Sequence, residues 1–161
     1  DARKDLTADL RVRSEVWSFG GPSEVGCIKA LSEELTDKQR VAVFKELENT
    51  PGVSTRDDLA LVGLAASIPE EDIERIVRGE LRKVVIVLTD GYSSNPHGAK
   101  KAIKDLRDKV VMVAAIGITS AANAAIELYK PDGRLAEHAA MTGVRVGEAL
   151  ESFIKELNGS H

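Results

Sequence analysis

A single carboxylate stands where an apolar strand pattern meets a loop rich in glycine and serine. Asp90 follows the run Val84–Leu88 and precedes Gly91, within the stretch 83–95 (KVVIVLTDGYSSN). An unbroken run of β-branched residues is typical of a parallel strand covered on both faces, and ligands of open α/β sheets bind at the carboxyl ends of such strands. Asp90 is therefore our first candidate for a ligand-binding side chain. An Asp here can also cap the helix expected from about His97 or bond to its own turn.

A second polar loop, Val53-Ser54-Thr55-Arg56, opens an apolar helical segment upstream. Together with the strand ending in Thr89-Asp90-Gly91, it resembles a von Willebrand factor A (vWA) domain over residues 11–157. The resemblance implies an α/β, Rossmann-like fold with an open, mostly parallel sheet and helices on both faces. It also implies that Thr55 and Asp90 belong to a metal-ion-dependent adhesion site (MIDAS). Mg²⁺ would be held there by hydroxyls, carboxylates and waters, and an Asp or Glu of a protein partner would complete its coordination.

The first element of the family pattern, an Asp-x-Ser-x-Ser loop after a hydrophobic strand, is absent. Residues 5–9 (DLTAD) space their oxygens similarly, but Leu6 and Leu10 recur at helical spacing, so we interpret this segment as the end of an amphipathic helix. Segment 11–19 then corresponds to the family's second strand, and the domain is incomplete at its N-terminus. The missing strand would lie between 11–19 and 83–89. Thr55 and Asp90 alone should bind Mg²⁺ weakly.

Two alternatives remain open. If 12–19 is instead the first strand, the loop 20–24 (GGPSE) is a degenerate metal loop, and the chain is a metal-free scaffold with a vestigial site. A receiver-like domain would accept a phosphoryl group on Asp90. It would also need an acidic pair and a Lys after a later strand, where Ile118-Thr119-Ser120 offers only a hydroxyl.

Composition predicts one domain over residues 1–161, with residues 158–161 as a tail or a remnant of cloning. The chain has 161 residues, 43% hydrophobic, with a net charge of −4, and its basic residues are mixed with acidic ones. Nucleic acid is therefore not an expected partner. The longest apolar run, 110–118, is too short to cross a membrane. The single Cys27 excludes an intrachain disulfide and is expected to be a buried or half-buried thiol. His97 and His138 lack a nucleophile context and are expected at the surface.

Alternating patterns predict a parallel sheet between helices. Capping boxes begin helices at Thr36, with Gln39, and at Ser67, with Glu70. Ser93 and Ser94 are expected to form a turn more than to line a site. Strands are expected at 11–19, 83–89, 110–118 and 143–146, helices at 36–48, 57–66, 67–78, 97–106, 121–129 and 147–157, and a helical insert at about 32–50. The strand at 83–89 is expected to be central in the sheet. Apolar residues at helical spacing predict a buried stripe on two helices, at Ala99, Ala102, Ile103 and Leu106 and at Val146, Ala149, Leu150, Phe153, Ile154 and Leu157.

We interpret the chain as a protein-binding module, not an enzyme, within a larger cytoplasmic protein. The resemblance implies a protein ligand at the metal site. It also implies an AAA+ ATPase or a metal-chelatase complex as a neighbour, with the insert at 32–50 as an added partner surface. This last step rests on analogy of fold alone.

Overall fold

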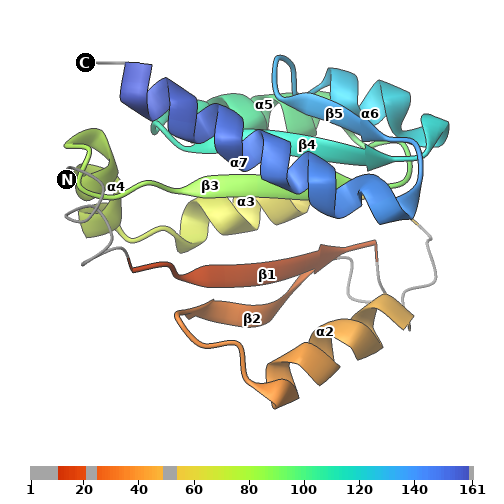
Figure 1. Cartoon of the computed structure of the whole chain (residues 1–161), viewed down its shortest axis with the longest axis horizontal. Helices are drawn as coiled ribbons and strands as arrows, with labels where there is room; N and C mark the ends of the chain where they lie inside the picture. The colour runs from red at the N-terminus through yellow and green to blue at the C-terminus, as the bar shows by residue number, and fades with distance from the viewer. Residues whose placement is uncertain (1–10, 21–24, 49–53, 160–161) are drawn as a thin grey trace, which may run out of the picture. The chain divides into compact units, whose positions relative to one another are not determined.

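The computed structural model describes residues 11–20, 25–48 and 54–159 (Figure 1). The helix expected before residue 11 and most of the loop 20–24 lie outside these ranges. Contacts divide the chain into two compact units, residues 1–53 and 54–161, and each unit is described by itself. The single domain expected from composition stays a prediction.

The first unit is built on a β-hairpin. Strand β1 (Ser14–Phe19) pairs antiparallel with β2 (Val25–Ser32). Strand β2 was not predicted from the sequence. The residue of β2 that is fully buried is Lys29, which is 1% exposed. Its ammonium donates to the carbonyls of Ser14 and Ser32. A lysine at this position and an irregular pairing register hide the usual alternation of apolar and polar residues.

Helix α2 (Asp37–Glu48) follows the hairpin and begins where the sequence predicts. The backbone N–H of Thr36 donates to Gln39 Oε1 (2.9 Å), and the N–H of Gln39 donates to Thr36 Oγ1 (3.3 Å). The predicted capping box is confirmed. Cys27, in β2, is exposed, so the expectation of a buried or half-buried thiol was wrong. Partial desolvation and the nearby Glu15 carboxylate raise the pKa of this thiol, which disfavours the reactive thiolate.

The second unit contains a parallel sheet in the order β3-β4-β5, formed by Val84–Thr89, Met112–Ile118 and Gly133–Ala136. Val85 and Val87 are buried, as expected for β3. We expected β3 at the sheet's centre, but in the described residues β4 is central and β3 is an edge strand. The predicted strand at 143–146 was wrong. These residues begin the last helix. The strand beside β4 opposite β3 is β5, a four-residue segment too short for its pattern to stand out.

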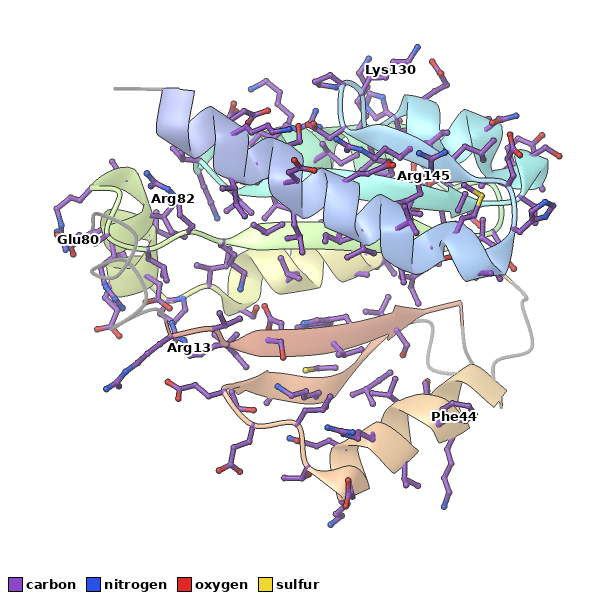
Figure 2. The ribbon with its side chains drawn as sticks, in the orientation of Figure 1. Arg13, Phe44, Glu80, Arg82, Lys130 and Arg145 are labelled. Carbon is purple, nitrogen blue, oxygen red and sulfur yellow. The ribbon has the colours of Figure 1, made fainter. Side chains whose placement is uncertain are left out.

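Helices cover both faces of this sheet (Figure 1). Helices α3 (Asp57–Ser67) and α5 (Pro96–Asp108) pack together on one face, and α7 (Thr142–Gly159) packs on β4 and β5. Arg145 extends from α7 toward β5, where its Nε donates to the Leu135 carbonyl at 2.9 Å (Figure 2). The smaller helical segments are α4 (Glu70–Val77), η1 (Ser120–Ala122), α6 (Asn123–Glu127) and η2 (Ala139–Met141).

The helix stripes read from the sequence are confirmed in α5 and only in part in α7. The α5 stripe Ala99, Ala102, Ile103 and Leu106 is fully buried. In α7, Ala149 and Phe153 are buried, whereas Leu150 and Ile154 are 40% and 56% exposed. The capping box at Ser67 was wrong, because Ser67 ends α3 and its hydroxyl donates to the Leu64 carbonyl (2.8 Å), while Pro69 stands at the N-cap of α4. No described helix combines the length and apolarity needed to span a bilayer.

Candidate functional site

Asp90 is exposed immediately after β3, at the carboxyl edge of the sheet. It does not cap α5, because Asn95 does so by accepting from the Gly98 backbone N–H (3.1 Å). The local turn is closed by Thr89 Oγ1, which accepts from the Gly91 N–H (3.4 Å). Among the described residues, none forms a hydrogen bond or ion pair with the Asp90 carboxylate. The structural roles that could have explained this acid are filled by its neighbours.

The Thr55 loop is joined to the loop that follows β3. The Thr55 N–H donates to Ser94 Oγ and the Ser94 N–H donates to the Thr55 carbonyl, both at 2.9 Å. A Cβ placed on Gly91 would stand 3.8 Å from Thr55 Oγ1, so the Thr55 hydroxyl lies beside the residue that follows Asp90. The fold therefore brings together the two loops singled out in the sequence. The metal role of Thr55 and Asp90 stays a prediction.

Two buried carboxylates at the start of α3 hold the loop that follows β3 in place. Asp57 and Asp58 are 3% and 4% exposed. Asp57 Oδ1 accepts from Ser93 Oγ (2.5 Å), and Asp58 Oδ2 accepts from Asn95 Nδ2 (2.9 Å). Residues 93–95 are thus each bonded to residues 55–58 through a side chain. We call this set of hydrogen bonds the loop clamp.

Sequence reasoning missed the loop clamp. Acidic residues in the first turn of a helix are common because they favour the helix dipole, so Asp57 and Asp58 carry no distinctive signal. Ser93 and Ser94 were expected to form a turn rather than to line a site. The structure shows that their hydroxyls form hydrogen bonds with Thr55 and Asp57, just before and at the start of α3.

Two groups in and beside the loop clamp, Asp58 and Tyr129, have shifted pKa values that fix their protonation. The hydrogen bond from Arg56, chiefly, holds the pKa of Asp58 below its ordinary value of 3.8. Tyr129 donates its hydroxyl to Asp57 Oδ2 at 2.9 Å. Burial, and then the charge and hydrogen bond of Asp57, raise the pKa of Tyr129 far above its ordinary value. Tyr129 therefore keeps its proton, and Asp58 its charge, across the physiological pH range.

Strand β4 ends beside the same edge in an unusual backbone conformation. Thr119 has φ 69° and ψ 167°, a region populated almost only by glycine, and it is exposed. Its N–H donates to the Ala136 carbonyl (2.9 Å), and its own carbonyl accepts from the Ala122 N–H (3.2 Å). These bonds impose the conformation. Such strain tends to cluster at functional sites.

The donor set at this edge suits a hard, hydrated cation. Asp90 offers an unpaired carboxylate and Thr55 a hydroxyl, which are ligand types that Mg²⁺ accepts while it keeps several waters. The described residues contain no cluster of three or more His, Cys, Asp or Glu side chains able to hold a metal. Softer metals that require such a cluster are therefore poorly matched by the described residues.

The fold defines an α/β domain in which Asp90 and the Thr55 loop lie together at the carboxyl edge of a parallel sheet. A model of the von Willebrand factor type A domain family matches residues 31–157, most of the chain, and the protein belongs to that family. The match begins near the end of β2, covers α2 and continues through the second unit to residue 157, near the end of α7. This assignment favours the vWA interpretation of Asp90 over the receiver-like one.

One relative provides a further comparison. The chain is 28% identical over 154 residues to an uncharacterized protein of Treponema pallidum (strain Nichols). The aligned region covers 91% of this chain and 24% of the relative, so the chain spans about a quarter of that protein's length.

Proposed function

We propose that this domain binds a divalent cation, Mg²⁺, at Asp90 and Thr55 and uses it to recognise a carboxylate of a protein partner. Domains of the vWA family are in general protein-interaction modules. The observation that carries the proposal is the exposed, unpaired Asp90 carboxylate beside the clamped Thr55 loop. A bound dication with a position open to a partner attracts an acidic side chain, because a negatively charged carboxylate oxygen is a stronger ligand for a hard cation than a neutral water is.

The arrangement suits binding more than catalysis. A cation held by two protein oxygens and waters leaves room for a partner. The polar side chains of the loop clamp beside it already make hydrogen bonds to one another. We place no catalytic residue here. An AAA+ ATPase partner and a cytoplasmic location belong to the same proposal and rest on the family resemblance alone.

The test uses Mn²⁺ as a paramagnetic probe on the ¹⁵N-labelled chain. Bound Mn²⁺ broadens the amide signals nearest to it, even when affinity is weak. We expect residues around Asp90 and Thr55 to broaden first and to recover when excess Mg²⁺ is added. Asp90→Asn should raise the Mn²⁺ concentration needed for half-broadening by about tenfold, because it removes the one free charge of the site.

Asp105→Asn is the matched control, since it removes the same charge from an exposed position on α5. It should leave the titration unchanged. Broadening spread over many surface acids, or equal titrations for the wild type and Asp90→Asn, would contradict the proposal. The metal-free scaffold would then be the better description.

A further inference from the structure

Tyr129 links a distant part of the chain to the candidate site. It follows α6, 72 positions from Asp57, and its side chain is fully buried. Its hydroxyl donates to Asp57 Oδ2 at 2.9 Å. The next residue, Lys130, is at the surface in the connection between α6 and β5 (Figure 2). Tyr129 thus reaches inward from a surface connection to a carboxylate under the candidate site.

Tyr129 is itself held in place by α5. Arg107 Nη2 donates to the Tyr129 carbonyl at 2.8 Å and to the Val113 carbonyl at 3.1 Å. The Asp132 N–H donates to the same Tyr129 carbonyl at 2.9 Å. The backbone that carries the ring is therefore tied to α5 and to β4. A tyrosine fixed in this way can impose an orientation on the group it contacts.

Asp57 is oriented by hydroxyl groups at both of its oxygens. Oδ1 accepts from Ser93 Oγ (2.5 Å) and from the Asp58 N–H (3.1 Å), and Oδ2 accepts from Tyr129. All three donors are neutral. Oδ1 has two donors, whereas Tyr129 is the one donor to Oδ2 among the described residues, so loss of the Tyr129 hydroxyl leaves a buried oxygen unsatisfied. Removal of the Tyr129 hydroxyl should let the Asp57 carboxylate turn and weaken its bond to Ser93.

We propose that Tyr129 is a positioning residue for the loop that follows β3, from Asp90 to Asn95. It fixes the Asp57 carboxylate, which holds Ser93, and Ser93 sets the path of the loop that begins at Asp90. The loop is thereby ordered before any ligand arrives, so the loop loses less conformational entropy when a cation and its acidic partner bind. The effect on the cation rests on the function proposed above, whereas the ordering of the loop does not.

The test compares Tyr129→Phe with Tyr92→Phe in the whole chain. Both changes remove one phenolic hydroxyl and keep the ring, but Tyr92 is 67% exposed on the same loop. Two quantities are measured. The first is amide hydrogen exchange of Thr55 and Ser94, whose N–H groups are bonded between the two loops, relative to the amides of β4. The second is the Mn²⁺ titration at Asp90. Normalising to β4 separates a local opening from a global loss of stability.

We expect Tyr129→Phe to speed the relative exchange of these two amides by about tenfold. It should weaken Mn²⁺ binding by roughly three- to tenfold. Tyr92→Phe should change neither. Ser93→Ala provides a double-mutant cycle. Because both hydroxyls act through Asp57, their effects on the Mn²⁺ titration should be clearly less than multiplicative.

Unchanged relative exchange in Tyr129→Phe, or independent effects of the two hydroxyls, would overturn this inference. If the wild type shows no localised Mn²⁺ binding, the proposed function fails. The exchange ratio, and the same cycle measured on it, then still decide the role of Tyr129. The two proposals can therefore fail separately.

Discussion

Three aspartates near one edge of the sheet have different tasks because their surroundings differ. Asp90 is exposed and unpaired, so its charge is available to a ligand. Asp57 is buried under hydroxyl donors, and Asp58 is buried beside Arg56. A buried carboxylate is costly unless it is bonded, so Asp57 and Asp58 stabilise the loop only while their partners remain.

The low pKa of Asp58 makes part of the domain's stability depend on pH. A folded-state pKa below the ordinary 3.8 means that the contribution is complete above that value and is lost as pH falls through the folded pKa. We expect Asp58→Asn to lower the unfolding free energy at neutral pH by about 1 to 3 kcal/mol. The loss should shrink as the solution is acidified. Urea unfolding between about pH 7 and about pH 2 measures it.

Asp105→Asn, at an exposed position, is the control and should stay near the wild type at every pH. A deficit of Asp58→Asn that is equal at neutral and at low pH would show that lost packing, not the Arg56 interaction, explains the change.

At the scale of elements, two glycines allow β4 and β5 to pack closely against η1 and α6. A Cβ on Gly117 would stand 2.7 Å from Ala122 Cβ, and a Cβ on Gly133 would stand 2.2 Å from the Ile126 carbonyl oxygen. The second contact is with backbone, which cannot move aside as a flexible side chain can. The α6–β5 connection that carries Tyr129 therefore depends on glycine at 133.

Gly133→Ala should destabilise the second unit by about 3 kcal/mol, at the upper end for overpacked sites. Gly147→Ala is the matched control in α7, where an added Cβ meets nothing within 4 Å. It should stabilise the helix by about 0.5 to 1 kcal/mol, since alanine favours helices over glycine. Chemical denaturation of both variants compares the two. A Gly133→Ala variant as stable as the wild type would contradict the close packing.

At the scale of the whole molecule, the described strands form two separate sheets. Strand β1 pairs only with β2, and β3 pairs only with β4. Segments 11–19 and 83–89 lie in different units, so their expected lack of direct pairing stays a prediction. The strand expected between them stays a prediction. One edge of β3 therefore has no strand partner among the described residues, and such an edge is a template for pairing.

Amide hydrogen exchange of the isolated chain tests this open edge. Alternate amides of Val84–Thr89 should exchange much faster than those of Ala115–Gly117, which have a strand on each side. The reason is that alternate N–H groups of a parallel strand point to opposite neighbours. Uniform slow exchange along β3 would show instead that its outer edge is occupied.

The sequence alone determined the features whose signal is local. The β-branched run of β3, the apolar run of β4, the buried stripe of α5 and the Thr36 capping box each lie within one element, and each was predicted. The place of Asp90 at a strand end followed from the same patterns, whereas its closeness to the Thr55 loop was implied by the family resemblance. The tertiary structure decided the rest. Strand β2 is disguised by a lysine that needs carbonyls from both strands, and β5 is too short to carry a pattern. The loop clamp joins Asp57 to Ser93 and to Tyr129, 72 positions away. No local pattern encodes such a contact, because its hydrogen bonds exist only after the chain has brought distant residues together.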